Sequence, residues 1–317
     1  MSTWLLADVG GTNTRIACWR AGTSPRMLDQ PGRYRNAGFS GLQDILAAYL
    51  DAREGTRPTR ALLAVAGPVV GQDVRLLNID WTFSVSQLAE SLGMEDVTAI
   101  NDFHAQARAL PLLGDDERTA IGSGTPVAGA AMAVLGPGTG LGVAGLTPDN
   151  YGGYAVVSGE GGHASLAAFN RFEDELLAEA RARCGHCSAE RLISGTGLTL
   201  LHDILHGEAG VAAEELGKRA TGGEPAAVRT LSVCFDLLGT VAGNVALTLG
   251  ARGGLYIAGG IALANRELFM ASGFRERFVD KGRYRNYLQA IPTWLVTAPT
   301  PALFGLALEA SQANRLT

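Results

Sequence analysis

The sequence predicts an α/β protein with two domains and room for a cleft between them. Its length of 317 residues exceeds that of a typical single core and allows two cores to be buried. Short apolar runs of extended type alternate with segments whose apolar residues recur at helical spacing, which is typical of the α/β class. The 42 glycines gather in turns between these segments, and 47% hydrophobic against 18% charged residues indicates a globular chain.

Two stretches of the chain share one pattern, in which an apolar strand enters a glycine-rich turn and a second strand leaves it. These stretches are residues 4–19, with the turn at 10–13, and residues 132–146, with the turn at 136–142. We expect both to form a strand, a turn and a second strand.

The other periodic segments predict further strands and helices. Pro301 suits the first turn of a last helix, because its missing N–H costs nothing there. Residues 111–129 are the best candidate domain boundary, since glycine, proline and charged residues interrupt the periodic segments there. We expect strands at residues 60–65, 97–100 and 255–258, and helices at residues 42–50, from 103 onward, and at 169–183, 228–249 and 302–313.

The net charge argues against two classes of partner. A formal net charge of −5 leaves no basic footprint for nucleic acid or for an anionic membrane surface. Asp8 interrupts the first apolar run, and no basic region precedes it, so we expect no signal peptide. We also expect no apolar stretch long enough to span a membrane. The four cysteines are scattered, which favours a reducing cytoplasm over a disulfide framework.

The two glycine turns have the composition that phosphate binding requires. Glycine lets backbone N–H groups crowd around phosphate oxygens, because a side chain would block the approach. Residues 10–12 and 138–140 both meet this need, and Asp8 is placed to hold the Mg²⁺ that bridges the phosphates. Neither turn matches the Walker pattern or opens a helix as the dinucleotide fingerprint does. For either turn alone, an ordinary hairpin is the alternative.

Asn101 and Asp102 lie where an expected strand ends and an expected helix begins. Asn and Asp are favoured at such a place because they cap the first turn, and taken alone capping is the preferred interpretation. A phosphoryl-acceptor hydroxyl, however, needs a carboxylate that orients it and takes its proton. Because an ordinary Asp is ionised at pH 7, Asp102 is also a candidate base.

An acid and an imidazole, Glu160 and His163, are separated by two glycines. A Glu-x-x-His metal site needs a helix to bring both ligands onto one face, and a glycine pair disfavours that helix. In a loop, Glu160 accepts and His163 donates or accepts hydrogen bonds, which is the mixed chemistry that vicinal sugar hydroxyls require. A structural histidine with satisfied hydrogen bonds is the alternative.

The segment from Cys184 to Glu190 allows three interpretations: a redox pair, half of a zinc site, or a loop that leads into a helix. A zinc site needs a second pair of ligands, and neither Cys18 nor Cys234 has a companion. A redox pair would need a thioredoxin-like context, which the helical sequence upstream does not supply. We therefore favour the loop, with Ser188 as a helix N-cap and Glu190 in the first turn.

Two glycine pairs flank the expected strand at residues 255–258. Gly253 and Gly254 precede it, and Gly259 and Gly260 follow it, as in backbone that approaches something flat. The flat partner could be the adenine of a nucleotide or a neighbouring helix, and both interpretations fit the glycine pairs.

The order of these motifs resembles that of one family over essentially the whole length. Residues 6–13 look like the first phosphate motif of the bacterial glucokinases, in the hexokinase, actin and sugar-kinase superfamily. Residues 136–142 look like the second phosphate motif, and residues 254–260 like the adenosine motif. The more specific matches are Ile100-Asn101-Asp102-Phe103, Gly159-Glu160-Gly161-Gly162-His163, and Ser188-Ala189-Glu190-Arg191 with Ser194-Gly195.

The resemblance implies roles for individual residues. Asp102 would be the catalytic base, and residues 78–81 would lie near the sugar. Related proteins carry a cysteine-rich zinc motif that residues 184–187 do not reproduce, so we expect no structural zinc. The sugar hydroxyls would be held by Asn101, Glu160, His163 and Glu190. The cofactors would be ATP and Mg²⁺, with the nucleotide bound by Asp8, Val9, Gly10, Gly11, Thr12, Asn13, Gly138, Thr139, Gly140, Gly259 and Gly260.

The resemblance also implies a two-domain, actin-like ATPase fold of the ribonuclease H-like kind, with the ligand cleft between the domains. The small domain would comprise residues 1–110, rejoined by the C-terminal helix at 299–317, and the large domain residues 111–298. Closure of the cleft on glucose would exclude water, which otherwise competes as an acceptor. A homodimer is expected from the family alone.

We therefore expect a cytoplasmic glucokinase of glycolysis that phosphorylates glucose to glucose 6-phosphate from ATP. Direct in-line transfer is expected, since the sequence shows no activated Ser, Cys or His nucleophile. A kinase of another hexose, a non-catalytic sugar or nucleotide sensor, and an actin-like polymer subunit remain alternatives. The sequence does not determine the breadth of hexose specificity, the choice of ATP over ADP or polyphosphate, the subunit interface or any regulation.

Overall fold

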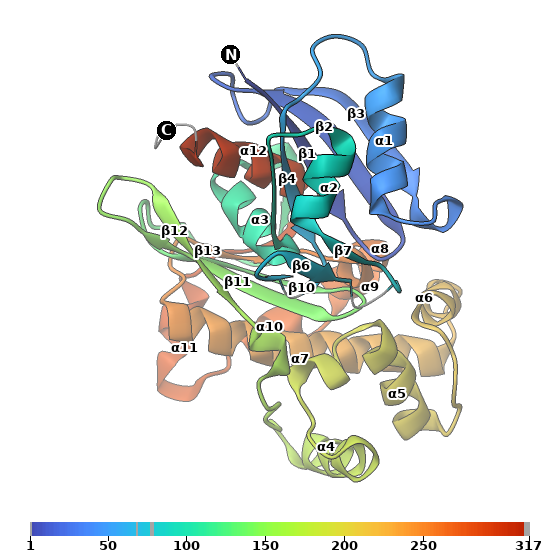
Figure 1. The fold of residues 1–317 in the computed structure, drawn as a ribbon. Coiled ribbons are helices and arrows are strands. Elements are labelled where there is room, and N and C mark those ends of the chain that lie inside the picture. The colour runs from blue at the N-terminus through green and yellow to red at the C-terminus, as the bar shows by residue number, and fades with distance from the viewer. Residues whose placement is uncertain (1, 68, 77–78, 314–317) are drawn as a thin grey trace. The chain divides into compact units, whose positions relative to one another are not determined.

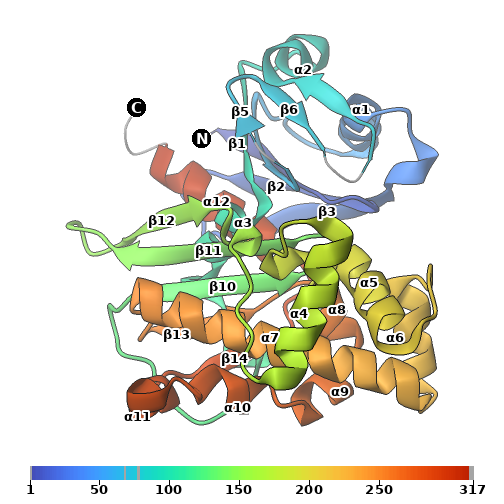
Figure 2. The same cartoon turned by 90° about the horizontal axis from the view of Figure 1, so that it is seen from below.

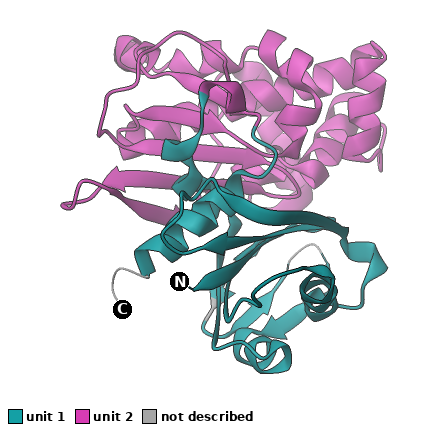
Figure 3. Ribbon diagram, turned by 90° about the horizontal axis from the view of Figure 1, so that it is seen from above, with its two compact units in different colours: residues 1–114, 298–317 teal, residues 115–297 magenta. Residues whose placement is uncertain are grey.

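The computed structural model describes residues 2–67, 69–76 and 79–313 (Figure 1). The chain divides into two compact units, which Figure 3 shows in different colours. Unit 1 comprises Met1–Gly114 and Ala298–Thr317, and unit 2 comprises Asp115–Thr297. Unit 1 has a five-stranded and a three-stranded sheet and two buried core clusters, and unit 2 has one sheet and one buried core cluster.

Unit 1 is built on a mixed sheet of β1 (Thr3–Val9), β2 (Asn13–Arg20), β3 (Leu28–Arg35), β4 (Arg60–Val65) and β8 (Asp96–Asn101). The strand order is β3-β2-β1-β4-β8. β1, β2 and β3 pair antiparallel, whereas β4 pairs parallel with both β1 and β8. A smaller antiparallel sheet in the same unit joins β5 (Val69–Val70), β6 (Asp73–Arg75) and β7 (Thr82–Ser84).

Helices cover both faces of the larger sheet of unit 1 (Figure 1). On one face lie α1 (Leu42–Ala52) and α2 (Val85–Leu92), and on the other lie α3 (Asp102–Ala109) and α12 (Pro301–Ala313). Side chains of a strand alternate between the faces, and β1 follows this rule. Leu5 and Ala7 are buried in the core beside α1, whereas Trp4 and Leu6 are buried in the core beside α12. β1 is therefore buried on both faces of the sheet, and its apolar residues form a nearly continuous run.

Unit 2 contains one sheet with the strand order β12-β11-β10-β13-β14-β9. β13 pairs parallel with both β10 and β14. The other neighbouring strands of the sheet pair antiparallel. The bounds are β9 (Arg118–Ala120), β10 (Met132–Pro137), β11 (Leu141–Pro148), β12 (Tyr154–Gly159), β13 (Gly254–Ile257) and β14 (Thr293–Val296).

The helices of unit 2 enclose one core with this sheet, and α7 lies along the sheet (Figure 2). Two short 3-10 turns, η4 (Gly161–His163) and η5 (Ala189–Arg191), belong to the candidate site. The helices are α4 (Arg171–Cys184), α5 (Gly195–His206), α6 (Ala213–Thr221), α7 (Pro225–Leu249), α8 (Gly260–Ala264), α9 (Arg266–Ala271), α10 (Phe274–Val279) and α11 (Arg285–Gln289).

Helix α7 corrects one expectation. Within the described residues it is long and apolar enough to cross a membrane by length and composition, so the expectation that no stretch reaches that length is wrong. However, 72% of its apolar window is buried inside the fold. Leu231, Phe235 and Leu238 of this helix are fully buried in the core of unit 2. The helix therefore has the packing of a core helix, in agreement with the expected helix at residues 228–249.

The expected strands and helices are confirmed in the described residues, with one exception. We expected Ser188 to cap a helix that contains Glu190. Ser188 instead precedes the 3-10 turn η5, and its side chain makes no cap hydrogen bond. The helix begins later, at Gly195, and its cap is Ser194, whose Oγ accepts a hydrogen bond of 3.0 Å from the Gly197 N–H. Ser188 and Ser194 are both followed by residues that can form a helix, so the sequence pattern alone did not show which of them begins the helix.

Candidate active site

The first glycine turn is the loop of the hairpin that β1 and β2 form. Val9 and Thr14 are the last paired residues, and the Gly10 N–H donates to the Asn13 carbonyl at 3.1 Å. Thr12 is exposed, and Gly11 and Asn13 are partly exposed. The expected strand, turn and strand are confirmed, and the backbone of the loop is accessible to a ligand.

A residue that the sequence analysis did not identify holds this loop in place. Asn36 is only 3% exposed, and its Nδ2 donates to the Gly10 carbonyl at 2.7 Å. Its Oδ1 accepts from the Thr14 hydroxyl at 2.9 Å, and its backbone N–H donates to the Thr12 carbonyl at 3.0 Å. Asn36 follows β3, far from the loop in sequence, and an Asn after a strand is ordinarily a turn residue. No sequence signal therefore identifies its role.

Asp8 lies in β1, directly opposite Arg15 in β2. Its Oδ2 accepts a hydrogen bond of 3.0 Å from the Arg15 guanidinium, and its side chain is 16% exposed. Burial raises the pKa of the Asp8 carboxyl above its ordinary value, while the charge and the hydrogen bond of Arg15 oppose the rise. Asp8, beside the first loop, thus forms an ion pair with Arg15, which the sequence analysis did not consider.

Asn101 and Asp102 lie at the junction of β8 and α3, as expected. The capping interpretation is confirmed for Asn101, whose Oδ1 accepts from the N–H groups of Phe103 at 2.9 Å and His104 at 3.3 Å. Asp102 is the first residue of α3 and is partly buried, and its Oδ1 accepts from the Phe103 N–H at 3.0 Å. The helix dipole favours a negative side chain at this place. The cap uses only the Oδ1 atom of Asn101, so it does not prevent a contact through the amide nitrogen.

The second glycine turn is also a hairpin loop, between β10 and β11 in unit 2. Pro137 and Leu141 are the last paired residues, and the Gly138 N–H donates to the Gly140 carbonyl at 2.8 Å. The Gly195 N–H, at the start of α5, donates to the Gly138 carbonyl at 2.8 Å. A Cβ at Gly138 would meet no atom within 4 Å. The loop therefore leaves open space beside its backbone, as a phosphate cradle requires.

Glu190 lies between the end of this loop and the imidazole of His163. Its Oε2 accepts a hydrogen bond of 2.8 Å from the Leu141 N–H, and its Oε1 lies 3.8 Å from the His163 Nε2. A Cβ at Gly140 would lie 2.5 Å from the Glu190 Oε2. The absence of a side chain at Gly140 thus makes room for the carboxylate of Glu190. The expected reason for a glycine here was room for a phosphate.

Glu160 directly precedes the turn η4, which follows β12, and His163 is the last residue of that turn. The Glu160 side chain is exposed, and the His163 side chain is 58% exposed. The His163 N–H donates to the Glu160 carbonyl at 3.0 Å. The expected loop is confirmed, and both side chains are available to a polar ligand. The structure brings His163 and Glu190 together in unit 2, and Asn101 and Asp102 together in unit 1.

The glycine pairs around β13 have partners that the sequence analysis did not anticipate. A Cβ at Gly254 would overlap the indole ring of Trp294, so the flat partner is a side chain of this chain. Gly259 has a φ of +88°, and its Cβ would lie 2.5 Å from the Pro137 carbonyl oxygen. Only a Cβ at Gly260 would meet no atom within 4 Å. Of these glycines, Gly260 presents open backbone to a ligand.

The cysteines are free thiols, and Cys187 is buried whereas Cys184 is partly exposed. Burial raises the pKa of the Cys187 thiol, which opposes formation of a thiolate ligand. In the described residues no group of three or more His, Cys, Asp or Glu side chains is arranged to hold a metal ion. The expectation of no structural zinc stays a prediction.

A family model described as Glucokinase matches residues 5–313. The chain belongs to the glucokinase family. The glucokinase of Chromobacterium violaceum is 43% identical over 309 residues, which cover 96% of this chain and 88% of that protein. The crystal structure of a glucokinase from an Antarctic psychrotroph covers 97% of this chain and 98% of that chain, with a TM-score of 0.84 and 36% identity. The resemblance seen in the motifs is confirmed.

Some glucokinase relatives are longer than this chain. The "Bifunctional protein glk" of Paraburkholderia xenovorans is 41% identical over 309 residues, which cover 96% of this chain and 48% of that protein. The chain thus spans about half the length of the bifunctional relatives that it matches. Membership of the glucokinase family confirms the α/β class and the two-domain actin-like fold, and it identifies the chain as a kinase.

Proposed function

We propose that the chain catalyses the ATP-dependent phosphorylation of glucose to glucose 6-phosphate by direct in-line transfer of the γ-phosphoryl group. The activity follows from the glucokinase family, whose model covers residues 5–313. One structural observation supports the mechanism. Glu190, a residue proposed to hold the sugar, is bonded to the Leu141 N–H at the end of the loop proposed to hold the phosphates. Sugar and nucleotide binding are thereby linked through one carboxylate.

Asp102 is proposed as the base that orients the acceptor hydroxyl and takes its proton. Asn101, Glu160, His163 and Glu190 are proposed to hold the other hydroxyls of glucose. The carboxylate oxygens accept hydrogen bonds, and the amide and imidazole nitrogens donate them, so the set matches the mixed character of a sugar. The separation of His163 from Glu190, 3.8 Å, leaves both side chains free to share one ligand.

The nucleotide is proposed to bind along the two glycine loops and the backbone at Gly259 and Gly260. Open space beside Gly138 and Gly260 supports this assignment, because a Cβ at either place would enter space that a ligand can fill. When bound, MgATP supplies the phosphoryl group and a divalent charge that offsets the negative charge of the transition state. Asp8 would hold Mg²⁺, directly or through water, since a carboxylate oxygen is a ligand that this ion prefers. The proposed nucleotide site comprises Asp8, Val9, Gly10, Gly11, Thr12, Asn13, Gly138, Thr139, Gly140, Gly259 and Gly260.

We propose that units 1 and 2 are the small and large domains of the family fold and that the enzyme acts as a cytoplasmic homodimer in glycolysis. The net charge of −5 supports the absence of nucleic-acid and membrane partners. Closure of the two domains on glucose would exclude water as a competing acceptor.

A panel of sugars and phosphoryl donors tests the proposed function. Glucose, mannose, fructose and glucosamine are each combined with ATP, ADP or polyphosphate, and product formation is measured. We expect glucose with ATP to give the highest kcat/KM. A higher value for another hexose would make the chain a kinase of that sugar. Glucose binding by calorimetry without turnover from any donor would show a sensor and would overturn the proposal.

A further inference from the structure

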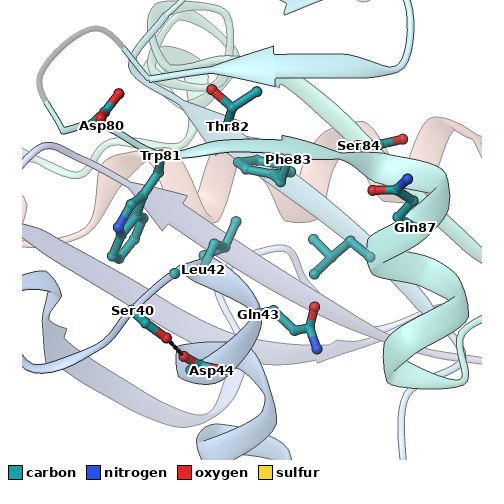
Figure 4. A pocket seen from close by; sticks show the side chains of 12 residues that line it. Ser40, Leu42, Gln43, Asp44, Asp80, Trp81, Thr82, Phe83, Ser84 and Gln87 are labelled. Carbon is teal, nitrogen blue, oxygen red and sulfur yellow. Dashed lines mark hydrogen bonds between the residues drawn. The ribbon is translucent and has the colours of Figure 1, made fainter.

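The pocket in unit 1, of about 360 Å³, is assigned to the proposed sugar site (Figure 4). Asp80 and Trp81 line it, and the family resemblance places both near the sugar. In unit 2, by contrast, two cysteines have no part in the proposed function.

These two cysteines are neighbours in the chain. Cys184 is the last residue of α4, and Cys187 follows it after two residues. Both are free thiols, and Cys184 is partly exposed whereas Cys187 is buried in the core of unit 2. The other cysteines, Cys18 and Cys234, are fully buried and come from β2 and α7. Cys184 and Cys187 are therefore the pair in which a reagent from solvent reaches one thiol and finds a second beside it.

The chain turns between the two thiols and brings them close. The Cys184 Sγ lies 3.8 Å from the His186 carbonyl oxygen, which belongs to the peptide bond that joins His186 to Cys187. Burial is the main cause of the raised pKa of Cys187, and the charge of Cys184 adds to it, as expected for neighbouring sulfurs. Gly185 has a φ of +72°, and a Cβ there would meet no atom within 4 Å. This glycine gives the turn the freedom to bring the sulfurs to a bonding distance of about 2.05 Å.

A disulfide here does not need a thioredoxin-like context. That context belongs to enzymes that exchange disulfides with other proteins. A disulfide that forms and opens within one chain needs two thiols within reach of each other, one of them accessible. The turn at Gly185 supplies the first condition, and the exposure of Cys184 supplies the second.

The segment that contains Cys187 pairs with another segment of unit 2. Residues 187–189 run antiparallel to residues 164–166, and Ser165 and Ser188 are bridge partners. Two backbone hydrogen bonds complete this ladder, from the Leu166 N–H to the Cys187 carbonyl at 3.1 Å and from the Ala189 N–H to the Ala164 carbonyl at 2.9 Å. The His186 Nε2 adds a side-chain hydrogen bond of 2.9 Å with the Ser165 Oγ.

The ladder ends at two residues proposed to hold the sugar. His163 directly precedes residues 164–166, and Glu190 directly follows residues 187–189. Because the segments are antiparallel, His163 and Glu190 lie at the same end of the ladder. The ladder therefore helps to set the distance of 3.8 Å between the His163 Nε2 and the Glu190 Oε1.

A disulfide would disturb this ladder. The Cys187 Sγ lies 3.9 Å from the Ser188 carbonyl oxygen, and the side chain packs in the core. To bond with Cys184, Cys187 must turn away from the core, because the two sulfurs must approach to about 2.05 Å. The Cys187 carbonyl then leaves its place opposite the Leu166 N–H, and Glu190 moves relative to His163.

We infer that Cys184 and Cys187 form a reversible disulfide when a hydroperoxide oxidises them, and that this bond weakens glucose binding at the site of the proposed function, on which the inference rests. With hydrogen peroxide, the Cys184 thiolate attacks one oxygen, the O–O bond breaks, hydroxide leaves and the sulfur becomes a sulfenic acid. The Cys187 sulfur then attacks the Cys184 sulfur, and its proton joins the departing hydroxide. The two thiols together lose two electrons and two protons, and the peroxide becomes two waters. A dithiol reduces the bond again.

Peptide mapping detects the bond directly. Trypsin cleaves after Arg183 and Arg191, so both cysteines fall in one peptide, residues 184–191. The full chain is treated with hydrogen peroxide, the remaining thiols are alkylated, and the peptide is weighed. We expect it to lose two hydrogen atoms and to escape alkylation. The glucose KM with ATP, and the glucose Kd from calorimetry without nucleotide, should each rise about fivefold or more, because sugar hydrogen bonds are weakened. Dithiothreitol should restore the peptide mass, the KM and the Kd.

Cys184→Ser and Cys187→Ala are the control variants, since each removes one thiol of the pair. Both should bind glucose as the reduced wild type does, before and after peroxide, because neither can form the bond. Cys184 is partly exposed, so its variant decides the test if loss of the buried Cys187 side chain impairs folding.

A peptide that keeps two free thiols after peroxide would overturn the inference. So would a disulfide that leaves the KM and the Kd unchanged. An equal rise in the wild type and in Cys184→Ser would also overturn it, because oxidation would then act at another residue, such as the exposed Met27. Turnover of the reduced enzyme is measured first. Its absence would count against the proposed function, while the peptide mass and the Kd would still decide the inference.

Discussion

At the scale of the residue, the candidate site depends on a few carboxylates whose surroundings differ. Asp102 begins a helix, Glu190 is bonded to the Leu141 N–H of the hairpin formed by β10 and β11, and Asp8 is paired with Arg15. The sequence predicted the place of Asp102 and Asn101 at a strand–helix junction, because a strand that ends beside a helix is a local pattern. The partners of Asp8 and Glu190 come from other strands and loops, so local patterns did not predict them.

Replacement of Asp102 by Asn tests the catalytic base. The amide keeps the size of the side chain but cannot accept the proton, so kcat should fall roughly 10²–10⁴-fold. Glucose binding, measured by calorimetry, should remain detectable. Asp51→Asn, at an exposed position of α1, is the control and should keep wild-type kcat. An Asp102→Asn enzyme with most of its kcat would exclude Asp102 as the base.

Two glycines of one loop give a matched pair of variants. Neither Gly138 nor Gly140 has a left-handed φ, so alanine is compatible with both backbones. In Gly140→Ala, the new methyl group displaces the Glu190 carboxylate, and the KM for glucose should rise roughly tenfold. In Gly138→Ala, the methyl group enters the open space beside the loop, and the KM for ATP should rise instead. Steady-state kinetics with each substrate varied separates the effects. A rise in the same parameter for both variants would contradict these roles.

At the scale of the element, the two hairpins were predictable and their supports were not. Alternating apolar residues around a glycine turn specify a hairpin through short-range backbone preferences. Asn36 reaches the first loop from the end of β3, 26 residues after Gly10. Only the pairing of β2 with β3 brings these residues together.

Asn36→Ala tests how the first loop is supported. The variant leaves the Gly10 carbonyl and the Thr14 hydroxyl without their buried partner. The free energy of unfolding in urea should fall by about 1–3 kcal/mol. Because the loop is proposed to bind phosphate, the KM for ATP should rise more than the KM for glucose. Asn286→Ala, at an exposed position of α11, should change stability by no more than about 0.5 kcal/mol. Equal effects of the two variants would show that Asn36 does not support the loop.

The contact between α3 and α12 predicts a pH dependence. Burial acts to raise the pKa of Glu309, but a hydrogen bond from His104 and the charge and hydrogen bond of Arg108 outweigh it and lower the pKa below its ordinary value of 4.5. The carboxylate therefore contributes stability above its ordinary pKa, and this contribution is lost as the pH falls through the lower folded-state pKa.

Thermal unfolding between about pH 5 and pH 3 measures this contribution. The Tm of the wild type should fall more steeply with acidification than that of Glu309→Gln, which lacks the titrating group. Glu90→Gln, at an exposed position of α2, should keep the wild-type slope. Parallel curves for wild type and Glu309→Gln would show that the ion pair has no net effect.

At the scale of the whole molecule, the last helix belongs to the unit that contains the N-terminus. Unit 1 joins Met1–Gly114 to Ala298–Thr317, and α12 packs on α3. The packing is close because residue 305 is a glycine. A Cβ at Gly305 would overlap the carbonyl oxygen of Ala105. The close approach of α12 to α3 therefore depends on a position without a side chain.

Gly305→Ala tests this dependence. The added methyl group forces α12 away from α3, and overpacking of this kind costs about 1–3 kcal/mol. The free energy of unfolding should fall by that amount in urea, whereas Gly38→Ala, where a Cβ meets no atom within 4 Å, should leave it nearly unchanged. Wild-type stability of the Gly305→Ala chain would mean that the helices separate at no cost.

The sequence by itself determined the α/β class, the two hairpins, the helix that follows Asn101, and the order of motifs that places the chain in the glucokinase family. These features depend on periodic burial and on the preferences of glycine, proline and capping residues, which act over a few neighbouring positions. Only the tertiary structure decided that Glu190 contacts a loop 49 residues earlier in the chain, that Trp294 is the flat partner of Gly254, and that Asn36 supports the first loop. The physical reason is that such contacts form between segments brought together by strand pairing and core packing, which no short stretch of sequence records.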